Sequence, residues 1–164
     1  AVVGRRDVME IFDEIFFSFT FGGETMSLAA AMATMVEMQE KKVVGHLWSV
    51  GRRLRDGFNV LAAEFGVADH ISCVGLGPRT STSFKDASGR GSLGLKSLFQ
   101  QESMKRGVLF SGGHNMCFSH SDADVEEALH VYRTAMEICA IALKEGDVTG
   151  RLEGPQIQPV FRQA

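Results

Sequence analysis

The spacing of apolar and polar residues predicts three amphipathic helices in the chain after residue 41. The first is expected from about Lys42 to Phe65, where apolar residues recur every three or four positions, and Gly66 ends it. A shorter helix is expected over 93–105. The last helix begins after Ser121, whose hydroxyl is placed to cap it. Helices with this pattern bury one side against other elements of a fold.

The segments between these helices have the pattern of strands and tight turns. Two strands, 70–75 and 79–85, flank the turn residues Leu76-Gly77-Pro78. A brief strand at 108–110 and a further strand at 114–118 follow. This order of elements predicts an α+β fold within the broad α/β class, with helices packed on one face of a small antiparallel or mixed sheet.

The first 38 residues have a different pattern. A short helix is expected over 7–14, and the residues 15–21 have the extended pattern of a strand. A helix of mainly Ala, Met, Ser and Thr follows over 24–38. Because small and apolar residues lie on most of its sides, we expect this helix to be buried between layers.

The junction between the expected strand and this helix is the best candidate for a binding site. The Gly22-Gly23 turn lets the backbone come close to a ligand, and the N–H groups at the start of the helix are free to bind an anion. Thr20 adds a hydroxyl group. This arrangement suits a phosphate, although most junctions of this kind bind nothing.

Composition and charge exclude several classes of protein. The 164 residues are enough for one domain with a real core. A net charge of −3 argues against a nucleic-acid surface, and no apolar run reaches membrane-spanning length. The chain starts at Ala1 without an initiator methionine or a signal-peptide pattern, so we expect it to be a piece of a longer protein.

The cysteines predict the compartment of the protein. Cys73, Cys117 and Cys139 are odd in number, widely spaced and surrounded by apolar residues. We therefore expect buried free thiols in a reducing cytoplasm.

Two short motifs are weak candidates for function. Gly89 to Gly94 matches G-x-G-x-x-G, but a polar loop separates it from the preceding strand, so a flexible loop is favoured over a dinucleotide site. His114, Cys117 and His120 have compact spacing, but they do not share one face of a strand and have no fourth ligand nearby. His114 would line a substrate cavity or, as the favoured interpretation, be a structural histidine with its polar atoms paired.

The residues alone provide no catalytic centre. The sequence lacks G-x-S-x-G, and its serines have no evident base beside them. Its lysines are expected on helix surfaces, helix ends or a strand end, where nothing would lower a lysine pKa for Schiff-base chemistry.

Five segments resemble one enzyme family in the same order along the chain. They are 1–9, 17–25, 106–110, 119–125 and 154–162. Together they resemble class III pyridoxal-phosphate-dependent aminotransferases, and the closest branch contains glutamate-1-semialdehyde aminomutase. The resemblance implies the C-terminal part of a fold-type I PLP-dependent transferase.

The resemblance also implies roles for two residues. The position of Thr20 binds the phosphate of a pyridoxal phosphate held mainly by the partner subunit of a homodimer. Phe19 would contribute through its backbone, although many family members have glycine there. The Schiff-base lysine of the family lies upstream of the segment that begins at Ala1, so no catalytic residue is assigned in this chain.

By the resemblance, the parent enzyme transfers an amino group between an amine or amino acid and a carbonyl compound. The lack of a carboxylate-binding arginine near 114–118 favours the aminomutase-like branch. Residues 1–38 would complete the large cofactor domain, residues 39–145 would form the small domain, and residues 146–164 would form a polar surface tail. The chain alone would be inactive.

A second hypothesis from another class remains open. The chain would be a non-catalytic module, derived from such an enzyme, that dimerises or binds a partner through its Ala/Met-rich helix. A dinucleotide-binding domain is a distant third. The amino donor and acceptor are not specified by the sequence.

Overall fold

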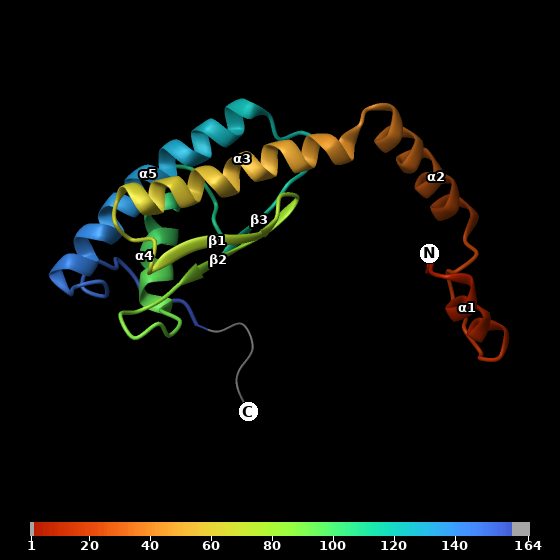
Figure 1. Ribbon diagram of the computed structural model, residues 1–164, viewed down its shortest axis with the longest axis horizontal. Coiled ribbons are helices and arrows are strands. Elements are labelled where there is room, and N and C mark those ends of the chain that lie inside the picture. Colours follow the sequence, from red (N-terminus) through yellow and green to blue (C-terminus); the bar gives the residue numbers. More distant parts are fainter. Residues whose placement is uncertain (1, 159–164) are drawn as a thin grey trace. The chain divides into compact units, whose positions relative to one another are not determined.

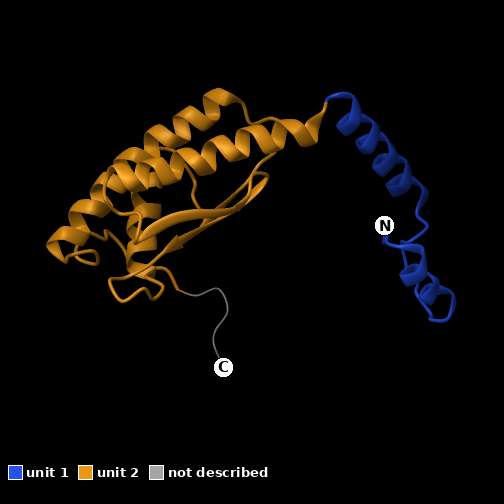
Figure 2. Ribbon diagram, in the orientation of Figure 1, with its two compact units in different colours: residues 1–41 blue, residues 42–164 orange. Residues whose placement is uncertain are grey.

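A computed structural model describes residues 2–158 and divides the chain into two compact units, residues 1–41 and 42–164 (Figure 2). The units are described separately below. The assignment of 1–38 and 39–145 to a large and a small domain stays a prediction. Residues 159–162, which belong to the tail that resembles the family, lie outside the described residues.

The first unit is helical. Its helices are α1 (Arg6–Met9), the 3-10 helix η1 (Glu10–Asp13) and α2 (Thr25–Glu40). The strand predicted over 15–21 is wrong, because residues 16–19 are irregular and 20–23 form a turn. A strand needs a neighbour to pair its backbone groups, and the described part of this unit offers none.

The prediction that α2 is buried between layers is also wrong, because in this chain the helix is exposed. No residue of α2 is buried, because nothing within its unit covers the helix. Apolar side chains project from several sides of it, a pattern typical of a helix that is enclosed by other elements. The large exposed ones are Met26, Leu28, Met32, Met35, Val36 and Met38.

The second unit is the predicted α+β layer. An antiparallel sheet with the strand order β1-β2-β3 carries helices on one face (Figure 1). Alternate strand residues such as Ile71 and Cys73 are buried under these helices, while Val74 is exposed. The elements are α3 (Val43–Glu64), β1 (Ile71–Leu76), β2 (Arg79–Phe84), α4 (Leu93–Met104), β3 (Gly113–Asn115) and α5 (Asp122–Glu145).

The sheet is smaller than predicted. Residues 108–110 are not a strand, and the strand expected over 114–118 is limited to β3. Phe110 is fully buried instead. Its ring packs 5.0 Å from that of Phe99 in a cluster that also holds Phe58, Phe84 and Tyr132. The apolar residues that looked like a strand therefore serve as an anchor in the core.

One close backbone approach fixes α3 on the sheet. A Cβ added to Gly51 in α3 would lie 1.9 Å from the carbonyl oxygen of Gly77, in the turn between β1 and β2. Such a separation is far below any contact distance, so only glycine fits. The helix thus lies directly on this turn.

Lys42, which precedes α3, is the only non-glycine residue with positive φ in the described chain, with φ of 51°. A left-handed backbone is strained for lysine and free for glycine. We expect Lys42→Gly to raise the free energy of unfolding by about 0.5–1 kcal/mol in denaturant titrations. Lys41→Gly is the matched control, because φ of −86° at Lys41 favours lysine. Equal effects of the two substitutions would contradict the prediction.

Candidate functional site

The turn predicted to bind an anion has unpaired backbone donors. The N–H of Gly22 donates to the carbonyl of Phe19 at 3.0 Å, and the N–H of Glu24 donates to that of Phe21 at 3.2 Å. The N–H groups of Thr20 and Phe21 donate to no described residue. The turn therefore leaves N–H groups free for a ligand.

A hollow of about 370 Å³ lies against this turn. A Cβ added to Gly23 would meet nothing within 4 Å, so the space beside the backbone is open. The hollow is lined by Val2, Phe17, Ser18, Phe19, Gly22 and Gly23. A phosphate group has room there.

The N-terminus of α2 is already capped by the side chain of the preceding residue, Glu24. The carboxylate of Glu24 accepts hydrogen bonds from the N–H groups of Met26 at 2.8 Å and Ser27 at 2.6 Å. The hydrogen bonds from Ser27 and Met26 lower the pKa of Glu24. The helix N-terminus predicted to attract an anion thus already has a carboxylate beside it, and this carboxylate offsets the partial positive charge of the helix dipole there. An anion at this junction would depend on the turn and not on the helix.

Thr20 and Phe19 are both exposed. No hydrogen bond joins the Thr20 hydroxyl to any residue in the described part of the chain. Phe19 has no positive φ, so its backbone conformation does not require glycine. Its ring packs 5.0 Å from that of Phe17. Cofactor binding by these two residues stays a prediction.

The turn lacks a cation. No lysine or arginine occurs between residues 16 and 24, and none lines the hollow. A phosphate dianion is normally bound with at least one cationic side chain. The turn therefore offers part of a phosphate site, with hydroxyl and N–H donors only.

His114, in the second unit, is a paired structural histidine, as the sequence favoured. Its Nδ1 lies 2.7 Å from the Thr80 hydroxyl and its Nε2 lies 3.0 Å from the Tyr132 hydroxyl. Burial lowers the pKa of His114 to about 4 and raises the pKa of Tyr132. His114 is therefore neutral at physiological pH.

A cavity of about 370 Å³ lies next to this histidine. His114 and Tyr132 form part of its wall, together with the polar residues Asn115, His120 and Asp124. The alternative that His114 lines a cavity is thus compatible with its structural role. No group of three metal-ligating side chains occurs among residues 2–158.

The cysteines differ from one another. Cys73 and Cys139 are buried, and burial raises the pKa of both, that of Cys139 to about 12. The prediction that Cys117 is buried is wrong, because it lies in the exposed loop after β3. The Ser119 hydroxyl, 3.1 Å away, lowers the pKa of the Cys117 thiol.

The G-x-G-x-x-G segment is divided between a loop and a helix. Gly89 has φ of 81° in a turn that the Asp86 carboxylate holds through the N–H groups of Ser88 and Arg90. Gly94 lies buried inside α4. The glycines of the motif therefore do not form one loop around a common point.

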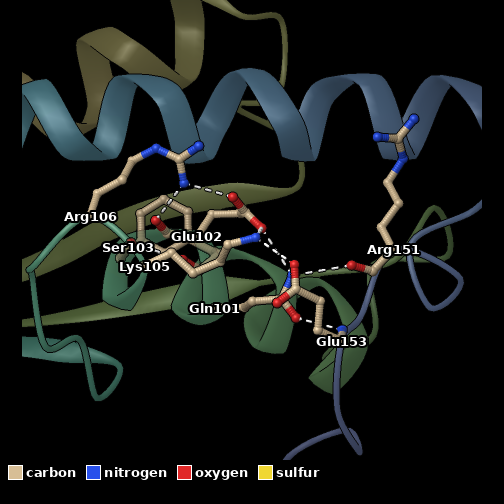
Figure 3. A network of polar contacts seen from close by, with 8 residues as sticks. Gln101, Glu102, Ser103, Lys105, Arg106, Arg151 and Glu153 are labelled. Atoms are coloured by element: carbon tan, nitrogen blue, oxygen red, sulfur yellow. Dashed lines mark hydrogen bonds and ion pairs between the residues drawn. The ribbon is translucent and has the colours of Figure 1, made fainter.

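A polar network on α4 was not found from the sequence (Figure 3). Glu102 is buried and pairs with Arg106 at 2.6 Å. Burial by itself would raise the pKa of Glu102, but hydrogen bonds from Gln101 and Arg106 outweigh it and lower that pKa. Gln101 also contacts Arg151 and Glu153 in the tail. In the sequence, only the four-residue spacing of the polar residues Ser97, Gln101 and Lys105 indicates this network.

Comparisons with known proteins point to one family. No protein-family model matches the chain. The glutamate-1-semialdehyde 2,1-aminomutases of Halobacterium salinarum and Halorubrum lacusprofundi are each 25% identical to it and match 83% of it. The chain spans 39% of the length of these relatives.

Solved structures agree in fold. A PLP form of the FumI protein of Sphingopyxis sp. MTA144 has a TM-score of 0.70 and 21% identity, covering 87% of this chain and 34% of its own. An omega-transaminase from Sphaerobacter thermophilus has a TM-score of 0.68 and 17% identity, covering 83% of this chain and 34% of its own. In sequence and fold, this chain resembles the C-terminal portion of class III PLP-dependent aminotransferases.

The aminotransferase relationship confirms the predicted fold class, helices packed on a small antiparallel sheet. Among residues 2–158, no helix has both the length and the apolar character needed to span a membrane.

Proposed function

We propose that this chain is the C-terminal portion of a homodimeric, cytoplasmic PLP-dependent aminotransferase or aminomutase. The complete enzyme would transfer an amino group between an amine or amino acid and a carbonyl compound. The chain alone would be inactive, because the Schiff-base lysine would lie in the preceding part. The observation that carries the proposal is the match of 83% of the chain to aminomutases.

The first unit supports a role in holding the cofactor phosphate. The open hollow is lined by Phe19, Gly22 and Gly23, which flank Thr20 and Phe21 and their free N–H groups, so the residues present fit part of a phosphate site. Pyridoxal phosphate, when bound, would supply an electron sink for the substrate amine. Thr20 and the Phe19 backbone would orient its phosphate, and the cation that the turn lacks would come from elsewhere in the dimer.

The exposed apolar side chains of α2 support an assembly larger than this chain. Met26 is 80% exposed, and five further large apolar residues of the helix are also exposed. Burying such a surface is strongly favourable. We assign it to contacts with the preceding part of the enzyme and with the second subunit, while residues 39–145 would close over the substrate.

The proposal is tested by joining the chain to the sequence encoded upstream of Ala1. The extended dimer is expected to bind pyridoxal phosphate with a visible absorbance band that disappears when the upstream lysine is replaced. An intact dimer without such a band would refute the proposal.

We expect Thr20→Val to weaken cofactor retention in the extended dimer. Valine has nearly the shape of threonine but cannot donate, and a hydrogen bond to a charged group contributes about 1.5–3 kcal/mol. The dissociation constant, measured by spectroscopic titration, would rise about 10- to 100-fold. Thr34→Val is the control, because the Thr34 hydroxyl donates to the carbonyl of Ala30 in α2. Unchanged affinity in Thr20→Val would remove Thr20 from the site.

The exposed surface of α2 also favours the second candidate, a non-catalytic module that dimerises or binds a partner. The encoding gene discriminates between the two. An in-frame upstream sequence with a lysine between apolar residues supports the enzyme, whereas a start codon directly before Ala1 supports the module.

A further inference from the structure

The tail after α5 runs along α4 and is held there by polar contacts. We call residues 147–158 the strap. The N–H of Ile157 donates to the Ser97 hydroxyl at 3.0 Å, and the N–H of Glu153 donates to the Gln101 side-chain oxygen at 2.8 Å. Gln101 also donates to the carbonyl of Arg151 at 3.1 Å. All three hydrogen bonds are made to backbone groups of the strap.

The side chains that hold the strap form a row on one side of α4. Ser97 and Gln101 in α4 and Lys105 at its C-cap are four residues apart, so they project in nearly the same direction. Lys105 pairs with Glu153 at the far end of the row (Figure 3). The row thus offers the strap backbone acceptors at Ser97 and Gln101 and a donor at Gln101, while Lys105 binds a strap side chain.

The strap packs closely against α4 at Gly94, where Val148, Thr149 and Gln156 surround the helix backbone, but it is more loosely packed further along. A cavity of about 220 Å³ lies between it and α4, lined by residues of both. Among the strap residues, Val148 and Leu152 are the apolar ones that pack against the core, and both are only partly buried. Segments with few buried apolar contacts open at lower free energy than the core.

The core beneath does not depend on the strap. Glu102 is buried, pairs with Arg106 just after α4 and accepts a hydrogen bond from Gln101, and neither partner belongs to the strap. The aromatic cluster around Phe99 joins α3, α4 and α5 without a strap residue. Removing the strap from α4 would therefore leave these contacts intact.

We propose that the strap is a detachable segment. It leaves and rejoins α4 as one unit while the helices and the sheet stay folded. The row of Ser97, Gln101 and Lys105 is accordingly a docking surface for an extended peptide backbone, and the occupant is the chain's own strap.

Amide hydrogen exchange of the full chain tests this proposal. In Gln101→Ala, exchange at Glu153 and Ile157 is expected to rise together by about tenfold, because two hydrogen bonds to the strap are lost. Ile157 is the decisive probe, since its partner Ser97 is unchanged. Trypsin should also cut after Arg151 faster by a similar factor. Gln100→Ala is the matched control and should change neither rate.

Three results would overturn the proposal. Faster exchange at Glu153 without a change at Ile157 would indicate local fraying. A rise of core amides by the same factor would make the strap and the core one cooperative unit. Unchanged rates would show that Gln101 does not hold the strap. If the variant fails to fold, exchange in the unaltered chain still tests the proposal. The free energies of opening at Glu153 and Ile157 must then be equal, and both must be well below that of the amides in α5.

Discussion

Replacing Gly51 with alanine is expected to lower the free energy of unfolding by about 3 kcal/mol, because the new methyl group would overlap the backbone of the β1–β2 turn. The added Cβ would lie 1.9 Å from the Gly77 oxygen and 2.4 Å from its carbonyl carbon. Backbone atoms cannot turn away as a flexible side chain can, so α3 and the turn must separate. Denaturant titration measures the loss directly.

Gly45 provides the matched control for this substitution. It lies in the same helix, and a Cβ added there would meet nothing within 4 Å. Gly45→Ala should leave stability unchanged or raise it by up to about 1 kcal/mol, since alanine favours helix more than glycine. If both variants were equally stable, α3 would not lie on the turn as described.

Stability is expected to fall by about 3 kcal/mol between pH 6.5 and pH 4 through His114 alone. Burial lowers the pKa of His114 from 6.5 to about 4, so the folded state keeps it neutral while the unfolded state takes up a proton. The unfolded state therefore binds more protons in this window, and stability is lost as the pH decreases. The groups facing the ring, from Cys73, Thr80 and Tyr132, are neutral and do not offset this effect.

The comparison with His114→Gln isolates this contribution. Glutamine can still hydrogen bond but does not titrate, so the difference in unfolding free energy between the two proteins should shrink by about 3 kcal/mol from pH 7 to pH 4. Carboxylates titrate equally in both proteins and cancel. A difference that does not vary with pH would show that His114 is not buried as a neutral group.

The second unit was predictable because its local signals and its packing agree. The three- and four-residue spacing from Lys42 to Phe65 gave α3 within a residue at each end. The capping box of Ser121 and Asp124 marked the start of α5. The turn at Gly77 placed the β1–β2 hairpin. Each pattern is completed by partners inside the unit itself.

The errors arose where a pattern depends on partners that the sequence does not reveal. The apolar run 15–21 has the composition of a strand but no neighbouring strand to pair with. The run 108–110 is irregular and packs Phe110 into the core. A short apolar run alone does not distinguish a strand from an irregular segment that buries one side chain.

The candidate site was predictable only in part. The turn at Gly22-Gly23 and the exposed Thr20 were expected, but the carboxylate cap from Glu24 was not. Its signal was present, since an acidic residue directly before a helix can accept from the N–H groups two and three positions later. A glycine pair before a helix therefore predicts an anion site only where the chain does not supply its own carboxylate at the helix start.

The exposed thiol of Cys117 affects how the size of this protein must be measured. Its lowered pKa increases the thiolate fraction at neutral pH, and the thiolate is the form that air oxidation couples into disulfides. Two chains joined through Cys117 would migrate as a pair in gel filtration and imitate a subunit contact made through α2. Sedimentation with and without a reducing agent, or in Cys117→Ser, separates a covalent artefact of storage from a dimer held by apolar surface.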